Sequence, residues 1–502
     1  MKIKLNKKYL LWAIVATCVF VLIVIFAGVF YGGGQSLAEP TSYHLQLDYD
    51  EENHVLYGKE SVKYVNNYDN AFSELCFHLY PNAFRQNSTS PVVSTNNASS
   101  AYPNGLSYGQ IDIISVTYEN GDIASYKIGG EDENILIVAL ENELYPDENI
   151  ELIIEFKTTL ANINHRLGYG ENTINFGNFY PIACVYERGK GFSQHLYHSN
   201  GDPFYSECSN YDVEIAYNDD YEIAFTGEKK GENKQRGKNT VFVKAENVRD
   251  FCFVLSDRFE KASQMCGDVE VNYFGYKDDE NLQDCLTTCT DALKTFENMF
   301  GKYPYPQISI VKSNFVHGGM EYPNIVLISD TINLQSDVNY VIVHEIAHQW
   351  WYGLVGNDQY SHAWMDEGLA EFSTLLFFKK NLAYGENFDA LVESAVQSYK
   401  LFEKVYVKVY GSVDGRMNRP LCEFQTDPEY VQCIYTKGTI MFNSLREMVG
   451  DKKLIGTLKN YCEEFKFKIV TPEDLIAKFV SSFGRGIEGF FDSWLEGRVV
   501  IQ

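Results

Sequence analysis

Positive charge is scarce in this sequence. Its 502 residues contain 42 Lys and Arg against 68 Asp and Glu, so the formal net charge is −26. Binding to nucleic-acid phosphates needs clustered Lys and Arg, and we therefore expect no nucleic-acid partner. The acidic excess suits a protein that works outside the cytosol or attracts cationic substrates, although a plain solvated acidic surface is the simpler interpretation.

Cysteine is also sparse, and internal repeats and low-complexity tracts are missing. The 11 cysteines have no scaffold-like spacing, and no C-x-x-C pair indicates a cysteine zinc site. Cys285 and Cys289 lie four residues apart on an expected helix, where they are either neighbours or simply buried free thiols. Cys422 and Cys433 could close a loop.

One long apolar run is present at the N-terminus. Four lysines within residues 1–8 precede an uncharged run of 23 residues, Tyr9 to Tyr31, and about 20 helical residues suffice to cross a bilayer. We expect a cytoplasmic basic segment (1–8), a transmembrane signal-anchor helix (9–31) and a linker (32–41). The rest of the chain would then lie outside the cytoplasm, held at the cell membrane. A cleavable signal peptide is the alternative, but its apolar region is usually only roughly 7–15 residues long.

The remaining chain changes pattern near Arg258. Up to that point apolar and polar residues alternate with period two between turn residues, which predicts an all-β domain (42–258). Within it, residues 85–105 are polar and typical of a long surface loop. Residues 259–502 are expected to be mostly helical with a small sheet, so the fold class is multidomain α and β. The expected helices are 280–301, 338–356, 363–381, 388–401, 435–448 and 472–483, and the expected short strands are 307–313 and 324–329.

Two histidines on one expected helix indicate a metal site. His344 and His348 are four residues apart, so both project from one helix face, with Glu345 in the same arc. This H-E-x-x-H spacing lets two imidazoles hold a zinc ion while the glutamate reaches a water on it. Glu367, on the next expected helix, has the right chemistry for a third ligand. Buried histidines that bond backbone carbonyls are the alternative for the histidine pair alone, and nearby Trp350, Trp351 and Trp364 are expected to be core packing.

Three ordered motifs resemble one known family. "HEIAHQWWYG" with "WMDEG" is similar to the zinc signature of the aminopeptidase N and leukotriene hydrolase family of zinc metallopeptidases, of the gluzincin type. "GGMEY" resembles its G-x-M-E-N exopeptidase motif, and "IYTKGTIMF" its Tyr-x-Lys-Gly segment. "LCFHLYPNAFR" and "YSECSNYDVEIAY" resemble its N-terminal β-saddle domain. The resemblance implies a saddle-like β domain, then a thermolysin-like catalytic domain, in a short form without the C-terminal helical domain.

The resemblance also implies roles for individual residues. His344, His348 and Glu367 would bind one Zn²⁺ per chain, and Glu345 would be the general base that activates water. Tyr435 would stabilise the oxyanion, with Tyr430 as the second choice. Substrate binding would involve four residues of the second motif, Gly318, Gly319, Met320 and Glu321.

Within that motif, Glu321 would pair with a free α-ammonium group. Glu371, one turn beyond Glu367, is either a residue that orients a ligand or an ordinary helix carboxylate. Tyr322 departs from the family's Asn, and a second amine-binding residue from the β domain has no recognisable position in this sequence.

The expected function is a membrane-anchored zinc aminopeptidase that acts on peptides with a free N-terminus. A zinc endopeptidase with the same ligands is one alternative, and a non-catalytic peptide-binding ectodomain is another. The sequence contains no signal for the oligomeric state.

Overall fold

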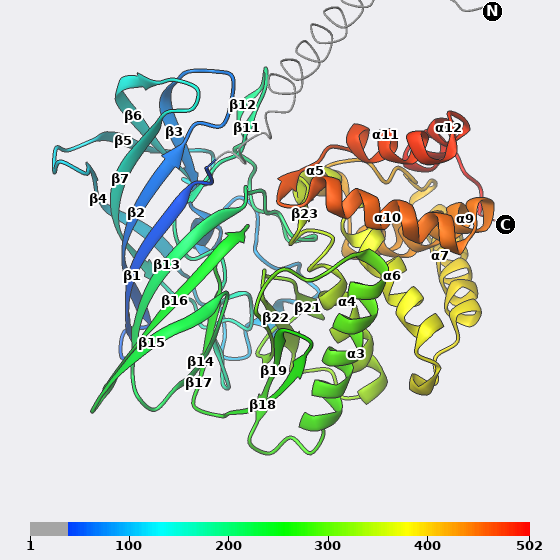
Figure 1. Cartoon of the computed structure of the whole chain (residues 1–502), viewed down its shortest axis with the longest axis horizontal. Coiled ribbons are helices and arrows are strands. Elements are labelled where there is room, and N and C mark those ends of the chain that lie inside the picture. Colours follow the sequence, from blue (N-terminus) through cyan, green and yellow to red (C-terminus); the bar gives the residue numbers. More distant parts are fainter. Residues whose placement is uncertain (1–38, 502) are drawn as a thin grey trace, which may run out of the picture.

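The computed structural model describes residues 39–501, and Figure 1 shows a β part on one side and a helical part on the other. The expected basic segment and anchor helix lie outside the described residues, as does most of the linker. Among residues 39–501, no helix combines the length and the apolar character that crossing a membrane requires.

The β part begins with a large sheet whose apolar residues alternate along the strands. Tyr43, Leu45, Leu47 and Tyr49 of the first strand are buried while the residues between them are not, as the period-two pattern predicts. In spatial order this sheet consists of β15 (Glu228–Gln235), β16 (Lys238–Val248), β13 (Ser209–Tyr217), β1 (Ser42–Asp50), β2 (Val55–Val65), β7 (Asn149–Thr159) and β4 (Gln110–Tyr118).

Three smaller sheets complete the β part. One contains β10 (Ile182–Ala183), β3 (Phe72–His78), β6 (Ile135–Leu144) and β5 (Ser125–Gly129). Another contains β14 (Glu222–Phe225), β17 (Phe253–Ser256), β9 (Ile174–Phe176) and β8 (Leu167–Tyr169). The third is a hairpin of β11 (Tyr186–Glu187) and β12 (Gly191–Phe192). Two short helical segments also occur, η1 (Tyr80–Phe84) and α2 (Ala98–Ala101).

The helical part contains a five-stranded sheet packed against α3. In spatial order its strands are β18 (Phe259–Cys266), β19 (Val269–Tyr276), β20 (Gln307–Ser313), β22 (Ile325–Ser329) and β21 (Gly319–Met320). The longer helices are α3 (Leu282–Phe300), α4 (Gln335–Ala347), α6 (Glu367–Lys380), α7 (Phe388–Tyr410), α9 (Lys437–Val449), α10 (Asp451–Phe465), α11 (Pro472–Phe483) and α12 (Gly486–Leu495). The short elements are β23 (Val355–Gly356), β24 (Lys468–Ile469), α5 (Gln359–His362), η2 (Leu382–Tyr384), η3 (Leu421–Glu423), α8 (Asp427–Val431) and η4 (Gln432–Thr436).

The helix that carries the histidine pair ends earlier than its apolar pattern predicts. α4 stops at Ala347, whereas residues 338–356 were all expected to be helical. The chain instead turns at Tyr352, which has a φ of +120°, and its carbonyl accepts a 2.7 Å hydrogen bond from Arg249 Nε of the β part. The apolar residues beyond Ala347, Trp350 and Trp351 among them, are buried as core packing.

Other expectations differ in detail. Residues 363–366 precede α6 rather than belonging to it, α7 continues nine residues past the expected end at Leu401, and neither α10 nor α12 was expected. Segment 85–105 is only partly a surface loop, because Val92, Val93 and Ala101 are buried. The ten cysteines among the described residues are free thiols, so Cys422 and Cys433 form no bridge.

Polar contacts join the two parts of the chain. The buried guanidinium of Arg249 donates to carbonyls of Ser206 and Tyr352 and to that of Lys468. From the helical part, the hydroxyl of Tyr322 donates a 2.6 Å hydrogen bond to Asn178 Oδ1. Tyr322 therefore points into the β part, which is why the departure from the expected Asn adds no side chain to the cavity described below.

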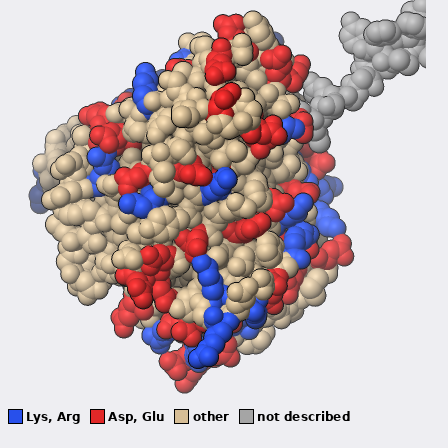
Figure 2. Space-filling model, turned by 90° about the vertical axis from the view of Figure 1, so that its left-hand side faces the viewer, with Lys and Arg blue, Asp and Glu red and all other residues tan. Residues whose placement is uncertain are grey.

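Charged side chains of both signs are scattered over one face of the molecule. Figure 2 shows one face, on which Asp and Glu lie interspersed with Lys and Arg and with uncharged surface.

Candidate metal centre

Three buried ligand atoms converge where α4 faces α6. His344 Nε2 and His348 Nε2 are 3.1 Å apart, and Glu367 Oε2 lies 3.3 Å and 3.1 Å from them respectively. α4 supplies the imidazole of His344, the residue that caps its C-terminal end supplies that of His348 one turn later, and the first residue of α6 supplies the carboxylate. The sequence predicted this group, and the structure brings its three members together.

The opposite ring nitrogens lie next to oxygen atoms that can accept hydrogen bonds. His348 Nδ1 is 2.9 Å from the carbonyl oxygen of Trp351, and His344 Nδ1 is 2.8 Å from Glu371 Oε2. With the protons on Nδ1, each Nε2 would be free to ligate a metal ion together with Glu367. Two imidazoles and a carboxylate whose ligand atoms lie this close together fit a divalent metal ion.

Glu345 lies beside this group, against the sheet edge. Burial raises the pKa of its carboxyl to about 7, and its Oε2 has no hydrogen-bond partner among the described residues. A Cβ at Gly319 would lie 2.3 Å from Glu345 Oε1, whereas one at Gly318 would approach nothing closer than 3.7 Å. Gly319 therefore makes room for the carboxylate, while Gly318 has no such steric requirement.

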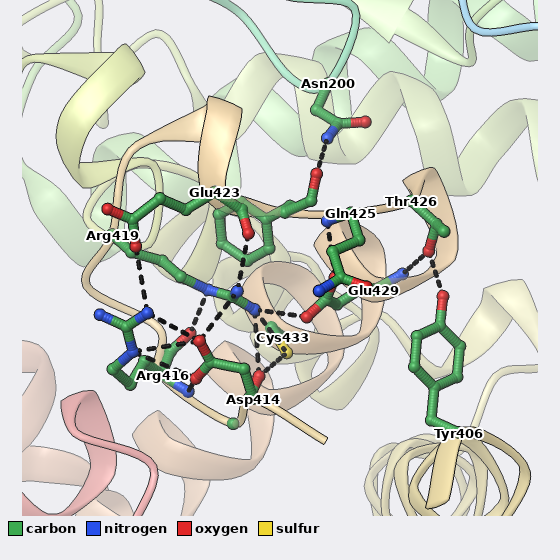
Figure 3. A network of polar contacts seen from close by, with 12 residues as sticks. Asn200, Tyr406, Asp414, Arg416, Arg419, Glu423, Gln425, Thr426, Glu429 and Cys433 are labelled. Atoms are coloured by element: carbon green, nitrogen blue, oxygen red, sulfur yellow. Dashed lines mark hydrogen bonds and ion pairs between the residues drawn. The ribbon is translucent and has the colours of Figure 1, made fainter. Parts of the chain in front are cut away.

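Tyr435 reaches the centre from a π-helical turn, η4. Its hydroxyl donates a 2.5 Å hydrogen bond to Glu367 Oε1, and single π-helical turns are common at functional sites. The chain before this turn is held by Arg419 (Figure 3), which donates to Asp414 Oδ2 at 3.2 Å and to Glu429 Oε1 at 2.9 Å. Asn200 of the β part donates to the same segment, at the carbonyl of Phe424.

A buried carboxylate, Glu321, lies next to the three ligands. It is 2% exposed, and one of its oxygens is within 4.8 Å of a ring nitrogen of His348. The amide of Gln359 donates to Glu321 Oε1 at 2.8 Å and to Asp366 Oδ2 at 2.7 Å. Neither Gln359 nor Asp366 was predicted from the sequence. Gln359 lies in a polar stretch between expected helices, and Asp366 belongs to the "WMDEG" segment, in which only Glu367 was assigned a role.

The β part contributes charge to the same cavity. The cavity has a volume of about 360 Å³ and is lined by the three ligands, Glu321, Glu345 and Tyr435, and also by Arg166 and Asp202. Arg166 Nη1 donates to Asp202 Oδ1 at 2.5 Å. Burial raises the pKa of Asp202, while Arg166 opposes that shift. These two residues lie in turns whose sequence carries no functional signal.

Met320 differs from its expected role. Its side chain is fully buried and is not among the residues that line the cavity, although its backbone belongs to the edge strand β21.

A larger hollow of about 830 Å³ lies between β14–β16 and the five-stranded sheet, but none of its lining residues is His or Cys.

The comparison with known families agrees with this geometry. Residues 285–494 match the peptidase family M1 domain. The likeness to peptidase family M1 thus covers this region of the chain. The family resemblance that the sequence motifs predicted is thereby confirmed.

Two curated proteins match part of the chain. Aminopeptidase B of Mus musculus is 29% identical over 230 residues, which cover 41% of this chain and 33% of that protein. Leukotriene A-4 hydrolase of Xenopus laevis is 29% identical over 201 residues, 38% of this chain and 31% of that protein. The matched region thus spans about a third of the length of these relatives.

Solved M1 structures extend the likeness to nearly the whole fold. The M1 zinc metallopeptidase of Deinococcus radiodurans has a TM-score of 0.64 at 15% identity, covering 92% of this chain and 94% of that one. A mutant of that enzyme bound to a Tyr-Ser-Ala substrate has a TM-score of 0.63 with the same coverage. At this identity the match establishes the fold, a β-rich N-terminal part followed by a helical part.

We predict that Glu371 tunes the affinity of the M1 metal centre. Tyr340 donates to Glu371 Oε1 at 2.5 Å, which aims Oε2 at His344 Nδ1. Glu371→Ala should weaken metal binding by about 10- to 100-fold, because an unsupported imidazole is a poorer and less oriented ligand. Competition with a chelator measures this affinity. Exposed Glu393 provides the charge-matched control, and equal affinities for the two alanine variants would contradict the assignment.

Proposed function

We propose that this chain is a zinc-dependent aminopeptidase that hydrolyses the N-terminal peptide bond of peptides. The observation that carries the proposal is the buried carboxylate of Glu321 beside a group of metal ligands in one cavity. A metal site alone supports hydrolysis at any position of a peptide. A fixed carboxylate next to it supports recognition of the free α-ammonium group.

The donor set His344, His348 and Glu367 suits zinc. A zinc ion held there would supply a Lewis acid that polarises the peptide carbonyl and acidifies water. Glu345 is placed to accept a proton from the attacking water and to return it to the departing amine. Its unpartnered Oε2 and its burial suit a base that exchanges a proton near neutral pH.

Tyr435 is placed to donate a hydrogen bond where negative charge develops on the substrate. Burial raises the pKa of its phenol well above the usual value, so the hydroxyl keeps its proton at neutral pH. The hydroxyl now donates to Glu367, and transfer of that hydrogen bond to the substrate oxygen would stabilise the transition state.

Glu321 and Asp202 together favour a cationic substrate group. Burial raises the pKa of Glu321, and the negative charge of Asp202 raises it further. An ammonium group bound between the two carboxylates would compensate Glu321 and add to the compensation that Arg166 already gives Asp202. Asp202 is thus our candidate for the second amine-binding residue, and the Tyr-Ser-Ala complex of the Deinococcus radiodurans enzyme supports a peptide as the substrate class.

Two alternatives remain to be tested against this proposal. A zinc endopeptidase would use the same ligands without depending on Glu321, and a non-catalytic ectodomain would bind peptides without cutting them.

The location at the cell membrane, with the catalytic part outside the cytoplasm, remains a prediction from residues 1–31.

The central experiment compares zinc content and hydrolysis in wild type and Glu345→Gln. We expect one catalytic zinc in each, with hydrolysis of an aminoacyl amide reduced about 100- to 10,000-fold in the variant, because only the proton transfer is lost. Stoichiometric zinc in the wild type without any hydrolysis would instead support the ectodomain alternative.

A second prediction concerns recognition of the free N-terminus. Glu321→Ala should lower kcat/KM for a free peptide by about 10- to 100-fold, the effect of losing a charged hydrogen bond, with zinc content unchanged. N-acetylation of the peptide should abolish cleavage by the wild type. Cleavage of acetylated and free peptides at equal rates would identify an endopeptidase.

A third prediction uses two adjacent glycines as a matched pair. Gly319→Ala should reduce kcat/KM at least tenfold, because the new methyl group displaces the flexible end of Glu345 rather than any backbone. Gly318→Ala should stay within about twofold of the wild type. Both should unfold at nearly the wild-type temperature, and equal activity of the two variants would show that Glu345 tolerates the displacement.

A further inference from the structure

A second group of metal-ligating side chains lies outside the catalytic cavity. Glu187 of β11, His195 just after β12 and Asp358 just before α5 offer ligand atoms that all lie within 4.8 Å of one another. His195 Nε2 is 3.1 Å from Asp358 Oδ2, the same separation as between the two catalytic imidazoles. None of the three residues lines the catalytic cavity. The group joins the β11–β12 hairpin to the helical part (Figure 1).

The group carries more negative charge than its protein partners compensate. Two carboxylates face one imidazole, and the ammonium of Lys190 contacts Glu187 Oε2 at 2.6 Å. Because the Lys190 side chain is 80% exposed, it is a weak and easily displaced partner. The side chains of His195 and Asp358 are 27% and 7% exposed, so an ion can enter from solvent and retain water ligands.

The ligands are already oriented. Asp358 Oδ1 accepts the backbone N–H of Ser361, which leaves Oδ2 for His195 or a metal ion. The ring of Tyr360 stacks on the imidazole of His195, with centroids 4.5 Å apart and planes 12° apart. An imidazole held in this way loses little entropy when it binds a metal ion.

A further imidazole nearby lacks a partner. His78 is 1% exposed, and neither of its ring nitrogens has a hydrogen-bond partner among the described residues. Burial lowers its pKa to about 3, and the charges of His195 and Asp358 also act on it. A buried imidazole without a partner is uncommon in a protein interior.

We propose that Glu187, His195 and Asp358 bind a second divalent metal ion of the zinc class, which positions the amine-recognition site. Imidazole with carboxylate ligands favours Zn²⁺ or Mn²⁺ over Mg²⁺ or Ca²⁺, which prefer oxygen ligands alone. The ion would fasten the hairpin of the β part to the start of α5.

Gln359 follows Asp358 directly in the sequence. The side-chain amide of Gln359 donates hydrogen bonds to both Glu321 and Asp366. An ion on Asp358 therefore restrains the segment that fixes Glu321, and Asp358 and His195 act as positioning residues. This step rests on the proposed aminopeptidase function.

Metal binding is tested without reference to activity. The chelator-treated full chain is titrated with Zn²⁺ by calorimetry, and bound metal is counted by mass spectrometry. We expect two equivalents in the wild type, one in His195→Ala and one in His348→Ala. Lys190→Ala, which removes the competing ammonium, should bind the second equivalent more tightly than the wild type. A single equivalent in the wild type, or two in His195→Ala, would overturn the proposal.

Kinetics test the positioning role separately. For a peptide with a free N-terminus, His195→Ala should raise KM about fivefold and leave kcat within twofold, and the milder His195→Gln guards against a folding defect. An unchanged KM despite loss of the second equivalent would overturn positioning and leave the metal site standing. Absence of hydrolysis by the wild type would overturn the proposed function, whereas the metal count would still decide the second site.

Discussion

Burial of several carboxylates around one cavity is the constraint on which the rest of this structure depends. An ionised carboxylate inside a protein is costly unless a cation or a hydrogen-bond donor compensates it. Glu367 faces two imidazoles, and Glu321 accepts from Gln359, but Glu345 keeps one oxygen without a partner among the described residues. The excess negative charge favours positively charged occupants, namely a metal ion next to the imidazoles and an ammonium group next to Glu321.

These carboxylates come from segments that are far apart in the sequence and line the same cavity. α4 and α6 hold the metal ligands, the edge strand β21 leads to Glu321, and the η4 turn presents Tyr435. Asp202 arrives from the β part, so the cavity depends on how the two parts of the chain meet. Arg249 and Tyr322 bond across that boundary, and Gly177 leaves the space that the Tyr322 hydroxyl occupies. Stability of the boundary and geometry of the cavity around Glu321 are therefore linked.

Periodicity and ligand spacing predicted the parts of the site that are local in sequence. The i, i+4 spacing of His344 and His348 requires only a helix, and Glu367 needed only a second helix packed on the first. Arg166, Asp202 and Gln359 could not be found in this way, because each acts through partners distant in sequence. The early end of α4 was missed for a similar reason, since Arg249, which follows β16 of the β part, donates a hydrogen bond to the carbonyl of Tyr352. An apolar pattern indicates which residues are buried, and here the residues after Ala347 are buried although α4 has already ended.

A single segment of ten residues connects the inner and the outer group of ligands. It begins at Asp358, which bonds His195, and ends at Glu367, which bonds His348. Between them the amide of Gln359 must direct its N–H groups inward, because both of its neighbours there, Glu321 and Asp366, are carboxylates that can accept. A shift at the outer end thus displaces a donor that two buried carboxylates share. Asp366 also accepts from Asn357 Nδ2 at 2.9 Å, whereas Gln359 is the side-chain donor to Glu321 among the described residues. Restraint of Asp358 is for this reason a way to hold Glu321 in place without any added contact inside the cavity.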